Sequence, residues 1–339
     1  MKFPKGETIY KETPSELLNL KELIAWIRSK KFYGILRGIV SEYETEILIT
    51  NGKLRKAFTY HQGELILSDE DAINMFVTDA LARNSKISLC SLDSKITKVL
   101  LVSLFTSPKI HDKEISLFVP SKLLEDCIKK NTISQLSILF SKDKYHFLFE
   151  GGELLGYYEE GEGMLKLDPE YKVFNELLNR GEGFLRFYQI TEEDFENLKL
   201  PSLKFGVIEE EMDKIYDVLL SYMNFLLDFY SQHGLSNGTI EGYIKNTNPF
   251  GESLVFYNKK FILKEIHEIG WNEFVEYFVS FIKMLNVEIA KYWGKKVTVQ
   301  KYQQVYKTFF EKYKNEPEIL KILEDLSPEK LEFEEGDHE

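Results

Sequence analysis

The six histidines are the side chains best suited to metal binding or to general base catalysis, but their spacing keeps them apart along the chain. No HxxxH or HExxH pair occurs, whereas a buried metal site needs three or four ligands. We therefore interpret the histidines as surface or partly packed side chains, and we expect no metal. They are His61, His111, His146, His233, His267 and His338.

Motifs for nucleotide binding and for nucleophilic catalysis are also missing from the sequence. The patterns GxxxxGK[ST] and GxSxG do not occur, and the Gly-Glu-Gly triplets at 161–163 and 181–183 each enclose a glutamate that opposes phosphate binding. Cys90 and Cys127 form no CxxC pair and have no neighbouring histidine, so packing in a reducing compartment is their expected role. We assign no catalytic and no cofactor-binding residue.

Two acidic clusters, at 68–71 and 159–162, are candidate cation sites. The first is better explained as the start of a helix, where carboxylates interact favourably with the helix dipole. The second falls at the end of a predicted hairpin. We favour a structural role for both clusters.

A polar segment at 234–250 is the candidate ligand-binding or partner-binding loop. Loops of this length within a domain often carry function, and a structural or partner-binding role is favoured over a catalytic one. The residues that we select in and beside it are His233, Asn237, Tyr243, Asn246 and Asn248.

The first part of the chain contains an internal repeat, which would position any functional residues there. Residues 23–77 align with 123–177 without a gap, and the matches fall at turn glycines and at alternating apolar positions. We therefore expect two copies of one small fold. The identities are Leu23/Leu123, Lys30/Lys130, Leu36/Leu136, Ser41/Ser141, Leu48/Leu148, Gly52/Gly152, Leu54/Leu154, Gly63/Gly163, Leu65/Leu165, Leu67/Leu167 and Glu70/Glu170.

Each copy is predicted to run helix, three strands, a short fourth strand, helix and closing strand. Asn51-Gly52 in the first copy and Gly151-Gly152 in the second supply the positive φ angles of a tight hairpin. In the second copy, Pro169 is predicted at the first helical position after Asp168. We also expect a one-residue slip of register just before the closing strand. The predicted segments are 16–30, 33–40, 45–50, 53–60, 64–67, 70–82 and 86–91 in the first copy, with 164–167, 170–179 and 183–188 among their counterparts.

The fold class that follows is α+β, with two tandem small antiparallel-sheet-plus-helix units and then a mainly α-helical C-terminal domain with one β-hairpin. Segments 106–113 and 190–204 are predicted linkers, and 234–250 is predicted to lack regular structure. The expected domains are 14–105, 113–190 and 205–328, with the hairpin at 253–266 and an acidic tail at 329–339. The C-terminal helices are expected at 205–233, 271–293, 299–314 and 318–326.

Composition limits the classes of partner. The formal net charge of −12 argues against a nucleic-acid-binding face and against attraction to anionic lipid. The first ten residues lack the apolar core of a signal peptide, and the apolar run 99–105 is too short to span a bilayer. The C-terminal region is rich in aromatic residues, which either fill a large core or form an interface. We expect a cytoplasmic protein without membrane insertion.

The first copy resembles the PATAN domain. The resemblance rests on the helix that runs from Leu17-Leu18 to Ile27, on Phe32-Tyr33-Gly34-Ile35-Leu36-Arg37, and on Ile47-Leu48-Ile49-Thr50-Asn51-Gly52-Lys53-Leu54. It covers about 14–92 and, through the repeat, a divergent copy at 114–188. The second copy departs from the pattern with Ser134 and Gln135 in place of glycine and an aliphatic residue, and with Gly151 in place of Asn or Asp.

The resemblance implies a role in bacterial signalling through protein contacts. PATAN domains occur beside receiver domains and have no fixed catalytic residues, so none is carried over to this chain. The expected function is that of a non-catalytic adaptor or scaffold whose partner is a signalling protein, such as a response regulator or a small GTPase; self-association stays open. The alternative is a small-ligand sensor or an unrecognised enzyme with its site near 233–250.

Overall fold

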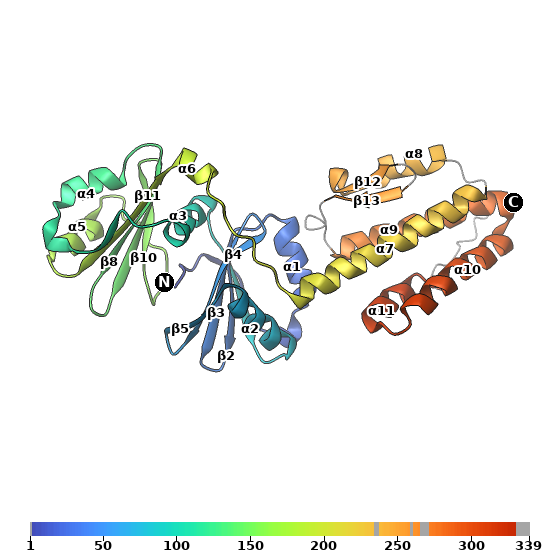
Figure 1. Ribbon diagram of the computed structural model, residues 1–339, viewed down its shortest axis with the longest axis horizontal. Coiled ribbons are helices and arrows are strands. Elements are labelled where there is room, and N and C mark those ends of the chain that lie inside the picture. The colour runs from blue at the N-terminus through green and yellow to red at the C-terminus, as the bar shows by residue number, and fades with distance from the viewer. Residues whose placement is uncertain (1, 234–236, 258–259, 265–270, 330–339) are drawn as a thin grey trace. The chain divides into compact units, whose positions relative to one another are not determined.

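The computed structural model describes residues 2–233, 237–257, 260–264 and 271–329 (Figure 1). Contacts within the chain define two compact units, of which the first comprises 1–20 and 30–206 and the second comprises 21–29 and 207–339. Both sheets of the repeat therefore lie in the first unit, whereas residues 21–29 of the first copy belong to the second. Of the acidic tail predicted at 329–339, residues 330–339 lie outside the described residues.

The first copy forms a six-stranded antiparallel sheet in the order β1-β6-β2-β3-β4-β5. Its hairpin turn has φ 51° at Asn51 and φ 71° at Gly52, as the sequence predicts. Helix α2 packs on one face of this sheet, against β2, β3 and β4. The elements are β1 (Glu7–Pro14), the 3-10 turn η1 (Ser15–Leu17), α1 (Leu20–Ser29), β2 (Gly34–Val40), β3 (Tyr43–Thr50), β4 (Lys53–His61), β5 (Glu64–Ser68), α2 (Asp69–Leu81), β6 (Lys86–Ser91) and α3 (Ser94–Phe105).

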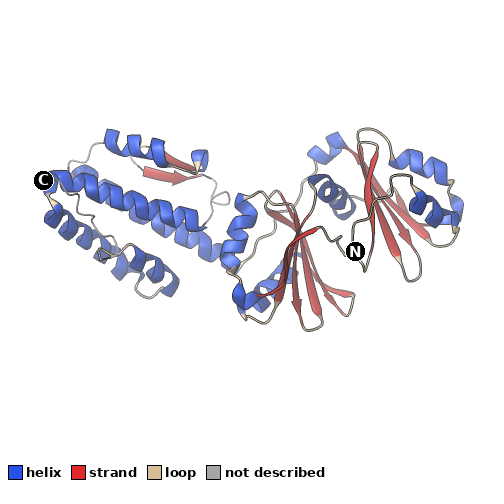
Figure 2. Cartoon of the chain, turned by 180° about the vertical axis from the view of Figure 1, so that it is seen from behind, coloured by secondary structure: helices blue, strands red, loops and turns tan. Residues whose placement is uncertain are grey.

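The second copy repeats this topology in a five-stranded sheet with the order β10-β9-β8-β11-β7, drawn in red beside its helices in Figure 2. Strands β7, β11, β8, β9 and β10 correspond to β1, β6, β2, β3 and β4. The predicted fold class, with its two tandem copies, is confirmed. The elements are β7 (Ile110–Glu114), η2 (Ile115–Leu117), α4 (Pro120–Cys127), β8 (Thr132–Leu139), β9 (Lys144–Glu150), β10 (Glu153–Glu159), α5 (Lys172–Asn179), β11 (Phe184–Thr191) and α6 (Glu192–Glu196).

The copies differ from the prediction in their details. The closing strands are offset by two residues, because Leu36 pairs with Leu89 while Leu136 pairs with Phe187. Segment 164–167 makes only isolated bridges where β5 stands in the first copy. The predicted linkers contain β7 and α6, since 110–114 adds an edge strand and 192–196 forms a short helix.

Pro169 does not begin helix α5, contrary to the prediction. Tyr171 takes a left-handed conformation with φ 54°, so the helix starts at Lys172. Asp168 still caps it, because its two carboxylate oxygens accept hydrogen bonds from the backbone N–H groups of Lys172 (2.8 Å) and Phe174 (3.0 Å).

The two copies share one apolar core. Ile35, Leu48 and Phe58 of the first sheet and Ile133, Leu148 and Tyr158 of the second belong to a single cluster of buried residues. Helix α3 follows β6 of the first copy, yet it packs on β8, β9 and β11 of the second sheet. A second core, between the other face of the second sheet and helices α4 and α5, includes Leu123 and Cys127.

The second unit is mainly helical, and α9 lies beside both α7 and α10 (Figure 1). Within the described residues, no helix combines the length and the apolar character needed to cross a bilayer. Many aromatic side chains of this unit are buried, among them Tyr222, Phe278 and Tyr302, whereas Phe225, Tyr257 and Tyr292 are exposed. The elements are α7 (Val207–Gln232), α8 (Asn237–Thr247), η3 (Gly251–Ser253), β12 (Leu254–Tyr257), β13 (Lys260–Leu263), α9 (Trp271–Trp293), α10 (Lys295–Tyr313) and α11 (Pro317–Asp325).

Helix α1 belongs by its contacts to this second unit. Its Arg28 forms an ion pair with Glu209 of α7, and its Lys21 lies 3.0 Å from the carboxylate of Glu211. The equivalent helix of the second copy, α4, instead packs on its own sheet. Equivalent helices of the repeat therefore have different structural roles.

Candidate functional site

The predicted loop at 234–250 is largely a helix, which corrects the sequence interpretation. Helix α8 occupies Asn237–Thr247, with Ile240 and Ile244 buried one turn apart. That i, i+4 pair of apolar residues stabilises the helix by burial and outweighs the low helix propensity of the glycines and asparagines around it.

The predicted site residues of this region are not brought together where their side chains are described. The Nδ1 atom of His233 lies 2.7 Å from the Phe229 carbonyl oxygen. Asn246 is exposed on α8, and the side chains of Asn237 and Tyr243 lie outside the described residues.

Asn248 has a structural role at the start of the hairpin region. Its amide Nδ2 donates to the carbonyl oxygens of Gly251 (3.2 Å) and Leu254 (2.8 Å), and its Oδ1 accepts from the Phe250 N–H (3.0 Å). Three hydrogen bonds to backbone groups hold the segment between α8 and β12, so this side chain is committed to the fold.

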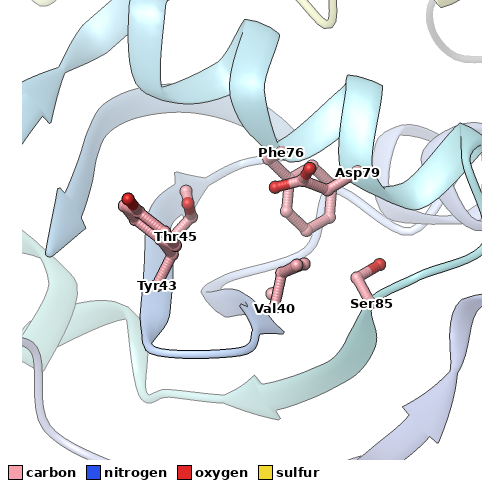
Figure 3. Close-up of a pocket in the computed structure, with 7 residues that line it drawn as sticks. Val40, Tyr43, Thr45, Phe76, Asp79 and Ser85 are labelled. Atoms are coloured by element: carbon pink, nitrogen blue, oxygen red, sulfur yellow. The ribbon is translucent and has the colours of Figure 1, made fainter. Parts of the chain in front are cut away.

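A surface recess lies between α2 and the end of the first sheet (Figure 3). Phe76 and Asp79 reach it from the helix, and burial raises the pKa of the Asp79 carboxyl. The hydroxyl of Ser85 is buried there and has no hydrogen-bond partner among the described residues. The recess has about 200 Å³ of empty space, part of which is open solvent. It is too narrow to hold a water molecule, so it offers no room for a substrate. The other lining residues are Gly38, Val40, Tyr43 and Thr45.

The two acidic clusters hold no arrangement suited to a cation. Asp69, Glu70 and Asp71 lie in the first turn of α2, as predicted. Asp69 Oδ2 forms an ion pair with Lys56 Nζ at 2.7 Å. Within the described ranges, no group of three or more His, Cys, Asp or Glu side chains is placed to bind a metal ion.

A cluster of buried charged and polar side chains lies between the two sheets. The repeat itself creates it, because Arg37 pairs with Glu46 across β2 and β3, and Ser137 pairs with His146 across β8 and β9. The four residues stand at equivalent positions one hundred residues apart. We call this cluster, with the neighbouring Glu160 and Tyr158, the seam.

The seam of the first copy is a buried ion pair. Arg37 Nε lies 2.7 Å from Glu46 Oε1, and the two side chains are 7% and 1% exposed. Burial raises the pKa of Glu46, while Arg37 and a hydrogen bond from the Phe3 N–H act in the opposite direction. A buried pair of this kind is stable only when its remaining hydrogen-bonding groups find partners.

The seam of the second copy is a serine, histidine and glutamate array. Ser137 Oγ lies 2.8 Å from His146 Nδ1, and His146 Nε2 lies 3.5 Å from Glu160 Oε2. Burial lowers the pKa of His146, against the effect of Glu160. Burial alone would raise the pKa of Glu160, but His146 and the backbone N–H of Lys2 lower it. At 3.5 Å the attraction between His146 and Glu160 is electrostatic rather than a well-formed hydrogen bond.

This array has the residue types of a hydrolytic triad without the access that catalysis needs. Ser137 and His146 are each 3% exposed, and the ring of His146 stacks on that of Tyr158 at 4.8 Å. The hydroxyl of Tyr158 is buried and has no hydrogen-bond partner among the described residues. A nucleophile must reach its substrate, so the array is a structural element.

An N-terminal segment, residues 2–5, runs through the seam and contacts both copies. The Lys2 N–H donates to Glu160 Oε1 (2.9 Å), and the Lys2 ammonium forms an ion pair with Glu44 of β3. The Lys5 N–H donates to the Gly163 carbonyl oxygen (2.5 Å). This segment lies outside the predicted repeat, whose first residue is 14.

Sequence reasoning missed the seam, although a signal was present. The five polar residues occupy strand positions that alternate with those of the other face and share the side of the common core, where apolar residues are expected. They are Arg37, Glu46, Gln135, Ser137 and His146. The repeat alignment places two of these polar residues above two others, which is the pattern of a shared buried site.

Neither a protein-family model nor a curated protein matches the chain. The functional interpretation therefore depends on the geometry of the repeat and of the seam.

Proposed function

We propose that the chain is a non-catalytic adaptor that makes protein–protein contacts through its two repeat units, in bacterial signalling and in the cytoplasm, as the resemblance to the PATAN domain implies. Its partner would be a signalling protein such as a response regulator or a small GTPase. The polar residues of the seam support this proposal, because they are buried and their hydrogen bonds and ion pairs leave no reactive group accessible there.

One observation carries the proposal. The equivalent 3-10 turns of the two copies each end in a highly exposed leucine. The exposed fraction of the side chain is 72% for Leu17 and 69% for Leu117. An apolar side chain exposed at the same turn of both copies is therefore our candidate contact residue. Two equivalent contacts also allow binding of both copies at once, with a gain in avidity.

Affinity capture at native expression tests this function. The wild-type chain is expected to recover a signalling protein, and Leu17→Lys combined with Leu117→Lys is expected to lose it, with each single variant intermediate. Leu81→Lys is the matched control, because Leu81 is also exposed, at 55%, but stands outside the duplicated turn. Recovery of the same proteins by the wild type and the double variant would contradict the proposal, as would recovery of none by the wild type.

The alternative of a ligand site near 233–250 gains no support from the side chains described there. His233 and Asn248 bond to backbone carbonyl oxygens and N–H groups of their own surroundings. We therefore favour the adaptor.

A further inference from the structure

We propose that the space between the two repeats is a binding site for an extended peptide in which a basic residue, an aromatic residue and a proline follow one another, and that the chain's own N-terminal segment occupies it as an intramolecular ligand. The inference goes beyond the adaptor role and does not rest on it, because it is derived from the contacts of residues 2–5 alone.

Arg37 and Glu46, which form an ion pair with each other, together bind the backbone of Phe3. Its N–H donates to Glu46 Oε2 and its carbonyl oxygen accepts from Arg37 Nη2, both at 2.9 Å. Arg37 and Glu46 are fixed to each other at 2.7 Å. Both polar groups of a single peptide residue are therefore recognised by charged side chains, which makes the hydrogen bonds strong.

The side chains of the segment define the sequence that the site accepts. Phe3 is 1% exposed and lies in the shared core, with its ring centroid 5.7 Å from that of Phe58. Pro4 is buried after it. A deep apolar pocket for one aromatic anchor is the usual source of affinity in peptide recognition.

The charge of the site selects a basic residue before the aromatic one. The Lys2 ammonium is paired with Glu44 and lies 5.2 Å from the centre of the Tyr60 ring. The backbone N–H of Lys2 donates to Glu160. An acidic residue at this position of a peptide would face two carboxylates, so the site discriminates by charge.

The segment is bound mainly through side chains of the two sheets, rather than through the backbone ladder of a strand. It makes one isolated bridge, between Lys5 and Met164, whereas β1 after it is paired along β6. The pairing of β1 begins at Glu7, just after Gly6, which packs closely on β6: a Cβ at Gly6 would lie 1.6 Å from the Ser91 carbonyl oxygen. Residues 2–5 can therefore leave the site without unpairing the β1–β6 ladder.

Competition between the attached segment and a free peptide gives the test. An intramolecular ligand lowers the apparent affinity for a free peptide by the fraction of molecules whose site is open. Weakening the attached segment must then strengthen the binding of the free one.

The probe is an acetylated peptide amide with the sequence of residues 2–8, Lys-Phe-Pro-Lys-Gly-Glu-Thr, with a fluorophore at its C-terminal end. Anisotropy titrations use the full chain. Phe3→Ala removes the aromatic anchor of the attached segment, and we expect it to bind the probe at least tenfold more tightly than the wild type does. The same peptide with alanine in place of phenylalanine is the matched control, expected to bind at least tenfold more weakly than the probe.

A second substitution locates the binding. In the Phe3→Ala chain, Arg37→Lys keeps the positive charge but loses the two-sided contact with Glu46 and the peptide carbonyl, and we expect at least a fivefold loss of probe affinity. Unchanged affinity would overturn the proposal, because the peptide would then bind elsewhere.

Folding of the variants is part of the test. Lys2→Glu repels the segment through Glu44 while keeping Phe3, and it is also expected to bind the probe more tightly than the wild type. If either variant folds, by far-UV circular dichroism, but binds the probe no better than the wild type, the proposal is overturned. If both variants unfold, residues 2–5 are an integral part of the fold rather than a ligand, which overturns it as well.

Discussion

Substitution of Arg37 by alanine tests the energetic importance of the seam. The variant leaves the Glu46 carboxylate, 1% exposed, without its counter-ion, and leaves the Phe3 carbonyl oxygen without its donor. Breaking a buried ion pair by removing one partner costs about 3–5 kcal/mol, and an unsatisfied buried carbonyl about 1–3 kcal/mol. Since both losses belong to one network they do not add fully, and we expect a loss of about 4 kcal/mol in the free energy of unfolding.

The repeat supplies a matched control at Ser137. Ser137→Ala removes one hydroxyl contact with His146 at the position equivalent to Arg37, and its expected cost is about 1 kcal/mol. The double variant Arg37→Met with Glu46→Leu removes the buried charge, yet it leaves both backbone groups of Phe3 without partners, so it should remain less stable than the wild type by about 2 kcal/mol.

The assay must report on the first unit alone. All three tryptophans, Trp26, Trp271 and Trp293, lie in the second unit, so their fluorescence in urea monitors that unit and is expected to change little. Hydrogen exchange of the β2 and β3 amides reports local stability in the first unit. The reasoning is refuted if Arg37→Ala costs no more than Ser137→Ala, or if the double variant is as stable as the wild type.

Three further predictions concern single buried groups. Burial lowers the pKa of His146 in the folded state, so the unfolded chain binds more protons than the folded chain as the pH falls below about 6.5. The free energy of unfolding should therefore decline below that pH, by up to about 1.4 kcal/mol per pH unit. His146→Gln should remove this pH dependence from the stability measured by hydrogen exchange between about pH 5 and 7. Equal slopes would contradict the assignment. Gly38→Ala should lower the thermal midpoint, since a Cβ there would lie 2.6 Å from the Phe76 ring and overpacking costs about 1–3 kcal/mol; an unchanged midpoint by calorimetry would show that the ring moves freely. Burial raises the pKa of the Cys127 thiol, so in a Cys90→Ser chain a disulfide reagent at pH 8 should label it only on unfolding, and rapid labelling of the native chain would argue against its burial.

The repeat was predictable because burial and turn geometry constrain residue type. Positions such as Leu48 and Leu148 face the shared core, and Gly52 and Gly152 both have positive φ, at 71° and 91°. Strand β1 was not predicted, because it lies at a sheet edge with nearly every side chain exposed and so has no apolar alternation.

Helix α8 was missed for the opposite reason. Its glycines and asparagines indicate a loop by local propensity, and only the burial of Ile240 and Ile244 in the second unit favours the helix. The two-residue slip before β11 was underestimated because an alignment by residue type does not define strand pairing.

The seam could be only partly predicted. The sequence places Glu46 above His146 in the repeat alignment, which marks both as polar residues in apolar strands. It does not show that these positions of both copies face one core, nor that Phe3 enters between them, because those contacts join residues far apart in sequence.

Helix α3 makes the duplicated region inseparable. It follows the last strand of the first copy in sequence but covers one face of the second copy's sheet. Each half alone would therefore expose a large apolar surface to water. Splitting the polypeptide after α3 should yield two pieces that are insoluble apart and recombine when refolded together. We therefore expect the duplicated region to fold and unfold as one cooperative unit.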